Sequence, residues 1–229
     1  MPSVPFSNAP SPPPGEVLIP SGPDELVADL SVPAGARGLV VFAHGSGSGR
    51  RSPRNRFVAR ALEQAGVATL LLDLLTPKEA AEDERTRRFR FDIPLLADRL
   101  VASVDWTEKE PRVRGMPLGL YGASTGGAAA LIAAARRPGR IGALVLRGAR
   151  SDLADPFAAR VSSPTLFIVG GLDREILAVN RTTSLRLRGP HQTTIVPGAT
   201  HLFEEPGALE AVTERTVGWF RQHLVESPS

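Results

Sequence analysis

The sequence predicts an α/β fold in which helices cover both faces of a mostly parallel sheet. The length of 229 residues suits one domain, and 42% hydrophobic with 22% charged residues is ordinary for a globular chain. From residue 38 onward, short apolar runs typical of buried strands alternate with longer segments that have helical spacing. This alternation indicates parallel strands joined by helical crossovers.

The first residues differ in composition from the rest of the chain. Residues 1–15 are rich in Pro and Ser, with no basic start and no apolar run, so we expect a flexible leader and no secretory signal. Residues 16–229 are expected to form a single domain. Its first two segments, 16–19 and 25–32, are extended, and the second ends at Pro33, which suits strands near a sheet edge.

Apolar runs and capping residues predict the remaining elements. Ser52 and Asp92 are expected N-caps, and Gly66 is an expected helix stop. The segment between Leu75 and Asp92, which contains Arg85, Arg87, Arg88 and Arg90, is expected to be a loop. The expected strands are 38–43, 67–72, 118–121, 143–146, 165–169 and 193–196. The expected helices are 53–65, 93–106, 125–137, 174–187 and 207–224.

Composition also excludes several functional classes. The chain has no Cys, so it has no disulfide, no thiolate zinc site and no cysteine nucleophile. No apolar stretch approaches the ~20 residues of a membrane helix, and we expect a cytoplasmic protein without a membrane partner. The net charge of +3 is weak support for nucleic-acid binding. We therefore expect no nucleic-acid partner, no metal and no organic cofactor.

Residues 122–126 fit the G-x-S-x-G pattern between an apolar strand and an Ala-rich helix. In that context the chain turns sharply and exposes the hydroxyl of Ser124, and the two glycines allow the close approach that the turn requires. A Gly- and Ser-rich turn without catalytic function is the alternative. We interpret Ser124 as the nucleophile.

A serine nucleophile needs a base, and four histidines are available. His201 follows the strand 193–196 at its carboxyl end, where active sites of such sheets form. His191 opens that strand and is expected at the opposite end of the sheet, while His223 lies in the last helix. His44 ends a central strand but precedes the nucleophile. We therefore expect His201 to be the base.

A carboxylate must orient the base, and Asp173 follows the strand 165–169 at its carboxyl end. Asp152 and Asp155 follow the preceding strand and are the alternatives. Asp173 could also serve as the N-cap of the next helix. We expect Asp173 to be the orienting acid.

The oxyanion of an acyl-transfer reaction needs backbone donors. We expect the amide of Thr125, at the start of a helix, and the amide of Ser46, in the Gly-rich loop 44–49. His44 and Gly45 are expected to contact substrate. The same loop partly matches a dinucleotide-binding fingerprint, but Arg50 stands at the sixth position where Gly or Ala is required.

These residues resemble the dienelactone hydrolase-related branch of the α/β-hydrolases, particularly the hydrolase half of proteins fused to a phosphoribosyltransferase. The matching stretches are VVFAHGSGSG (40–49), LYGASTGG (120–127), IVGGLD (168–173) and VPGATHLFEEPG (196–207). The resemblance extends from about the second strand to the last helix. It implies an eight-stranded core with Ser124, Asp173 and His201 as the catalytic triad, in the chain order of that fold.

Two departures refine what the resemblance implies. Dienelactone hydrolases proper use a cysteine nucleophile, whereas this chain has Ser124, which favours ester hydrolysis over dienelactone hydrolysis. Only 18 residues (147–164) separate two strands between which many α/β-hydrolases insert a lid. The site is therefore expected to be open and suited to small esters.

Arginines follow several strands, and a solvated surface with weak ion pairs is their simplest interpretation. The sharper hypothesis is that Arg54 or Arg147 binds a carboxylate or phosphate of the substrate.

The sequence as a whole predicts a hydrolase that cleaves a small-molecule carboxylic ester through an acyl-enzyme. Three alternatives stay open: a thioesterase or acyltransferase with the same residues, a non-catalytic binding module of this fold, and an arginine-mediated binder of nucleotide or nucleic acid. The oligomeric state is left open.

Overall fold

The computed structural model describes residues 15–226, which form an eight-stranded sheet in the order β1-β2-β4-β3-β5-β6-β7-β8. The strands are β1 (Gly15–Ser21), β2 (Asp24–Ser31), β3 (Leu39–Ala43), β4 (Ala68–Leu72), β5 (Leu118–Ala123), β6 (Ile141–Arg147), β7 (Thr165–Gly170) and β8 (His191–Val196). Strand β2 is antiparallel to β1 and β4, and the other pairs are parallel. The mostly parallel sheet is thus confirmed. Apart from Gly15, the expected leader lies outside the described residues.

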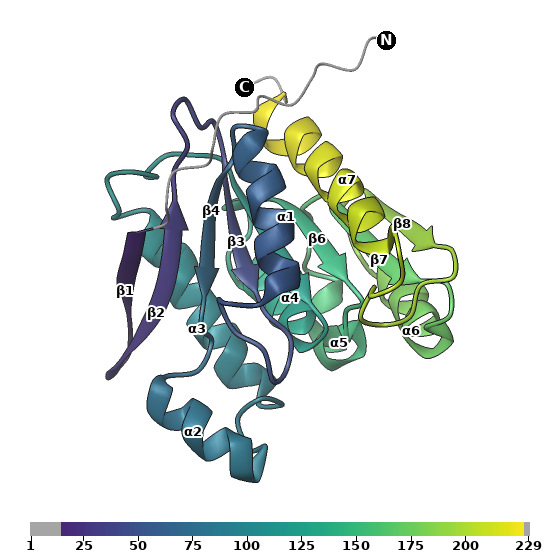
Figure 1. Ribbon diagram of the computed structural model, residues 1–229, viewed down its shortest axis with the longest axis horizontal. Coiled ribbons are helices and arrows are strands. Elements are labelled where there is room, and N and C mark those ends of the chain that lie inside the picture. The colour runs from purple at the N-terminus through teal and green to yellow at the C-terminus, as the bar shows by residue number, and fades with distance from the viewer. Residues whose placement is uncertain (1–14, 227–229) are drawn as a thin grey trace.

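Helices cover both faces of the sheet (Figure 1). On one face, α1 and α7 pack on a core that includes Phe42, Tyr121 and Phe220, and on the other, α3 and α4 pack on a core that includes Leu70, Leu100 and Leu131. The expected caps Ser52 and Asp92 accept hydrogen bonds from helix backbone amides. The helices are α1 (Pro53–Gln64), α2 (Pro77–Thr86), α3 (Ile93–Thr107), α4 (Thr125–Arg136), α5 (Asp155–Ala158), α6 (Arg174–Ser184) and α7 (Ala208–Phe220).

The segment 75–92, expected to be a loop, contains the helix α2, which projects beyond the sheet in Figure 1. A capping box begins this helix: the Thr76 hydroxyl accepts from the Glu79 amide, and the Glu79 carboxylate accepts from the Thr76 amide. The Thr-Pro-x-Glu sequence was a readable start signal, with Pro77 at the first helical position. The expectation of a loop was therefore wrong.

The last helix also differs from its expected range of 207–224. Helix α7 ends at Phe220 and continues as a π-helical turn, Arg221–Val225. Between β6 and β7 the chain forms only the 3₁₀ turn Ser151–Ala154 and the short helix α5. No lid domain is therefore inserted there. Within residues 15–226, no helix is long and apolar enough to span a membrane.

Glycines let the chain at the carboxyl ends of β3 and β5, and at those of β7 and β8, pack closely. A Cβ on Gly126 would lie 2.2 Å from the carbonyl oxygen of Ala43, and one on Gly170 would lie 2.4 Å from that of Ala199. Neither position can hold a side chain without movement of the backbone. The loops after these four strands therefore pack in two pairs at this edge of the sheet, where ligands of open α/β sheets bind.

Candidate active site

Ser124 lies at the turn between β5 and α4. Its backbone has φ 50° and ψ −118°, a conformation that non-glycine residues rarely adopt. The turn is tight enough that a Cβ on Gly122 would lie 2.6 Å from the Cα of Gly127. The surrounding structure thus maintains a strained residue, as is common for residues at functional sites.

His201 lies between Ser124 and Asp173. The Ser124 Oγ is 3.3 Å from His201 Nε2, and His201 Nδ1 is 2.6 Å from the Asp173 Oδ2. The ring packs against Gly148, where a Cβ would lie 3.2 Å from the ring Cε1. The structure therefore brings together the three residues that the sequence indicated, in a continuous chain of hydrogen bonds.

The carboxylates near this site have distinct partners. Asp173 occupies the N-cap position of α6, yet its side chain makes no capping hydrogen bond. The alternative acids are engaged elsewhere, since Asp152 pairs with Arg150 at 2.8 Å and Asp155 pairs with Arg186 at 2.8 Å. Asp173 is thus the carboxylate bonded to His201.

The loop after β3 is held by buried polar contacts at both of its ends. The buried ring of His44 accepts a hydrogen bond from the Leu74 amide at 3.0 Å through Nε2, which leaves Nδ1 to donate to the Gly45 carbonyl at 2.9 Å. Burial lowers the pKa of His44, which favours this neutral form. At the other end, the Arg50 amide and guanidinium both donate to Asp73. The ring of His44 therefore holds the loop, and both of its nitrogens are occupied.

Gly45 packs against the nucleophile, because a Cβ there would lie 3.2 Å from the Cβ of Ser124. The next residue, Ser46, and Thr125 at the first position of α4 flank Ser124. Within residues 15–226, neither amide donates a backbone hydrogen bond outside the regular helices and strands. The first amides of a helix have no acceptor within it, so they are available to an anion.

Two adjoining hollows meet at Ser46 and Thr125, which border both. The inner hollow has a volume of about 210 Å³ and the outer about 270 Å³. The inner hollow is lined by His44, Gly45, Ser46, Gly47, Ser48, Leu75, Ala80, Asp83, Glu84, Arg90, Leu96 and Thr125. The outer hollow is lined by Ser46, Phe91, Ser124, Thr125, Arg150, Glu175, Ile176 and His201.

Arg54 and Arg147 line neither of these hollows. Arg147 is buried, and its guanidinium lies 5.7 Å from the ring centre of Phe203. Arg54 pairs at 2.9 Å with Glu204. Both partners belong to the segment that follows His201, so these two arginines contact the loop that carries the histidine.

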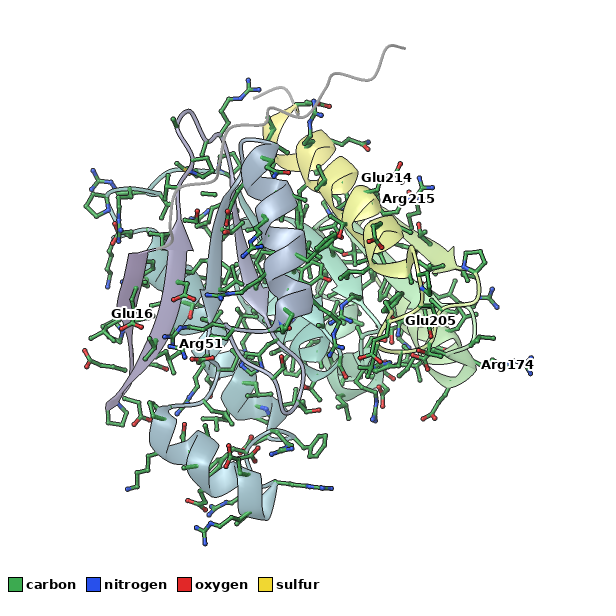
Figure 2. The ribbon with its side chains drawn as sticks, in the orientation of Figure 1. Glu16, Arg51, Arg174, Glu205, Glu214 and Arg215 are labelled. Carbon is green, nitrogen blue, oxygen red and sulfur yellow. The ribbon has the colours of Figure 1, made fainter. Side chains whose placement is uncertain are left out.

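The loop that carries His201 is also stabilised by contacts within itself. Phe203 is buried and has a φ of 56°, and the Thr200 amide donates to the Glu205 carboxylate at 3.0 Å. Figure 2 labels Glu205 in this loop, and it shows Arg174 pointing away from the loop toward solvent. Arg174, the residue after Asp173, is thus directed away from the site.

Phe91, Arg150 and Glu175 line the outer hollow but were not singled out from the sequence. Arg150 is one of the strand-following arginines that were expected on a solvated surface, whereas Glu175 follows the carboxyl end of β7, a position that could have marked it. Phe91 directly precedes the N-cap of α3, and no sequence signal distinguished it. Within the described part of the chain, no group of three or more His, Asp or Glu residues is arranged to hold a metal ion.

Comparisons with known proteins agree with this fold. A model of the dienelactone hydrolase family matches residues 28–224. The crystal structure of a dienelactone hydrolase from Anabaena variabilis is 51% identical, with a TM-score of 0.90, covering 92% of this chain and 99% of that one. It shares the α/β-hydrolase fold described above.

Curated relatives add two further names. Two Mycobacterium tuberculosis proteins that carry phosphoribosyl transferase in their names are 50% identical over 209 residues, which is 91% of this chain and 46% of theirs. The chain therefore spans about half the length of these relatives. A Bradyrhizobium protein that carries lactonase in its name is 28% identical over 191 residues, covering 73% of this chain and 77% of that protein.

Proposed function

The chain belongs to the dienelactone hydrolase family, and we propose that it is a serine hydrolase that cleaves small carboxylic esters through an acyl-enzyme intermediate. One observation carries the proposal: the hydrogen-bonded series Ser124, His201 and Asp173, which begins at a strained strand–helix turn. A serine hydroxyl becomes a useful nucleophile when a base accepts its proton, and the base is effective when a carboxylate fixes its tautomer.

The proposed proton path follows the hydrogen bonds among these three residues. His201 Nε2 accepts the proton of the Ser124 hydroxyl as Oγ attacks the ester carbonyl, and the resulting imidazolium is stabilised by Asp173. Nε2 then protonates the leaving alcohol, and the acid part of the ester stays bound to Oγ. A water molecule, deprotonated by the same nitrogen, releases the acid and restores the serine.

The negative oxygen of each tetrahedral intermediate requires donors that are already in place. The amides of Thr125 and Ser46 flank Ser124 and border both hollows, and we assign them this role. The loop that contains Ser46 is fixed at its ends by His44 and Arg50. Preorganised donors of this kind are each worth about 10²–10³-fold in kcat.

Small esters fit this site better than long acyl chains. No lid is inserted between β6 and β7, and the two hollows, at about 210 and 270 Å³, each lie below the ~300–1,000 Å³ typical of drug-sized ligand pockets. A lactone is a cyclic ester and would use the same residues. The name of the Bradyrhizobium relative makes lactones a second class of substrate to test.

The test is hydrolysis of p-nitrophenyl esters from acetate to octanoate by the wild type and Ser124→Ala. We expect the wild type to prefer the short esters, and we expect the substitution to remove nearly all activity, because the loss of a serine nucleophile lowers kcat by about 10⁶-fold. Equal rates in the two proteins would reject Ser124 as the nucleophile. Activity on thioesters alone would replace the ester hydrolase by a thioesterase.

A further inference from the structure

Successive residues of one turn face the two hollows. Arg90 lines the inner hollow and Phe91 lines the outer one. The turn that contains them joins α2 to α3, and it lines the two hollows together with Ser46 and Thr125, the residues that the hollows share. This turn therefore borders both parts of any substrate bound at Ser124.

The ring of Phe91 is 55% exposed, although a phenylalanine is normally buried. The backbone of the two preceding residues is held by Asp83, whose carboxylate accepts hydrogen bonds from the amides of Phe89 and Arg90 and from the Arg90 guanidinium. Burial opposes ionisation of Asp83, but these hydrogen bonds outweigh it and lower the pKa of the carboxyl. The turn that carries Phe91 is thus held in place before a ligand binds, which reduces the entropy that the backbone loses on binding.

The position of His201 identifies which part of an ester meets Phe91. Ser124 and His201 both line the outer hollow and neither lines the inner one, and His201 must reach the oxygen of the leaving alcohol to protonate it. The alcohol part therefore lies in the outer hollow with Phe91. Ser46 and Thr125, which we assign to the oxyanion, border both hollows, so we place the acyl part beyond them in the inner hollow, whose apolar lining is Leu75, Ala80 and Leu96.

The charges that line the outer hollow give little selectivity between substrates. Arg150 and Glu175 both line it and carry opposite charges, and Arg150 is already paired with Asp152. Ile176 and the ring of Phe91 are its large apolar surfaces, and the ring is the flat one. Flat rings stack favourably on one another beyond the area that they bury.

We propose that Phe91 determines specificity by packing its ring on the alcohol part of the ester, so that aryl esters are the preferred substrates. This inference rests on the proposed ester hydrolase activity and adds the substrate class to it. Phe91 takes no part in proton transfer or in binding the oxyanion. Its replacement therefore changes the choice of leaving group while the acyl-enzyme chemistry continues.

The experiment compares two acetates with leaving groups of similar acidity, phenyl acetate and hexafluoroisopropyl acetate. The quantity measured is the ratio of their kcat/KM values, in the wild type and in Phe91→Ala, Phe91→Leu and Phe91→Tyr. We expect Phe91→Ala to lower the phenyl-to-alkyl ratio by about 2- to 12-fold, the range of an aromatic pair. Phe91→Leu should lower it as well, because leucine is apolar but not flat, and Phe91→Tyr should preserve it.

Phe57 provides the matched control, since it is a second exposed phenylalanine, at 42%, and lines neither hollow. Phe57→Ala should leave the ratio unchanged. A ratio that is the same in the wild type and Phe91→Ala would overturn the aryl proposal while leaving the ester hydrolase intact. Failure of the wild type to hydrolyse either acetate or to react with a fluorophosphonate would instead refute the proposed function, and the aryl preference with it.

Discussion

The two loops that flank Ser124 are held in place by different balances of hydrogen bonding and close packing. The loop after β3 is fixed by buried hydrogen bonds, from the Leu74 amide to His44 and from Arg50 to Asp73. The loop after β8 has a hydrogen bond from the Thr200 amide to the Glu205 carboxylate and an exposed ion pair to Arg54, but its main support is close packing. Gly170 packs against its backbone, Gly148 packs against His201, and Arg147 lies over Phe203.

The difference matches what each loop presents to the site. The loop after β3 presents backbone amides, whose direction depends on the peptide planes, and hydrogen bonds to its main chain and ends fix those planes. The loop after β8 presents a side chain, the His201 ring, which needs a defined surface on one side and a carboxylate at Nδ1. Substitutions in the loop after β3 should therefore displace backbone amides, whereas substitutions around the loop after β8 should change the orientation of the His201 ring.

The largest effect on kcat is expected at Asp173, the carboxylate that is hydrogen-bonded to His201. Asp173→Asn should lower kcat by about 10⁴-fold with little change in KM, because an amide no longer fixes the tautomer that accepts the serine proton. Steady-state kinetics on a short p-nitrophenyl ester would measure this. Asp152→Asn is the matched control, since Asp152 pairs with Arg150 and should leave kcat nearly unchanged. A reversal of the two results would make Asp152 the orienting acid.

An intermediate effect on kcat is expected at His44, and its replacement should also change how stability depends on pH. Burial lowers the pKa of His44 below its ordinary value of about 6.5, so below that pH the unfolded chain binds more protons than the folded one. The stabilising contribution of neutral His44 is therefore complete above about pH 6.5 and declines as the pH falls toward the lowered value. His44→Gln should remove this part of the pH dependence of unfolding and lower kcat by about 10²-fold, through a displaced loop.

His223 provides the control for that measurement. Burial lowers the pKa of His223 as well, but this residue lies in the turn Arg221–Val225, away from the site. Denaturant unfolding between pH 5 and 8 should show that His223→Gln alters the slope of stability with pH while kcat stays at the wild-type value. An equal loss of kcat in both variants would contradict the positioning role of His44.

The smallest effects are expected at the two arginines that contact the loop of His201. Arg147→Met should lower the free energy of unfolding by about 2 kcal/mol, the value of a desolvated cation–π contact, because the guanidinium is buried over Phe203. Arg54→Gln removes a more exposed pair with Glu204 and should cost about 0.2–1 kcal/mol. Urea denaturation of both variants gives the comparison. A more stable Arg147→Met variant would mean that burial of the charge outweighs the ring contact.

Much of the fold could be predicted from the sequence, because buried parallel strands are continuous apolar runs and the helices between them begin at caps such as Ser52 and Asp92. Ser124, Asp173 and His201 each follow a strand at its carboxyl end, so topology alone indicated that they could meet. The structure brings them within hydrogen-bonding distance. Sequence order contains no information about the direction of a side chain, which is why Arg54 and Arg147 were expected at the substrate.

The missed features have two separate causes. Helix α2 was missed because its arginines and acidic residues resemble a solvated loop, although Thr76 and Glu79 form a capping box that the sequence displays. Phe91 was missed for a physical reason, since an exposed aromatic residue in a turn is visible only once burial is known. A pattern of apolar residues indicates which side chains need a core, not which one is left outside it.

The most direct test of the central claim is to trap the acyl-enzyme. The protein would be mixed with excess p-nitrophenyl acetate, quenched in acid within milliseconds and analysed by intact and peptide mass spectrometry. We predict a burst of p-nitrophenol and one added acetyl group, located on Ser124 within the turn of Gly122 to Gly126 and absent from Ser124→Ala. An enzyme that turns over with no burst and no adduct, or that carries the acetyl group on another residue, would contradict nucleophilic catalysis by Ser124.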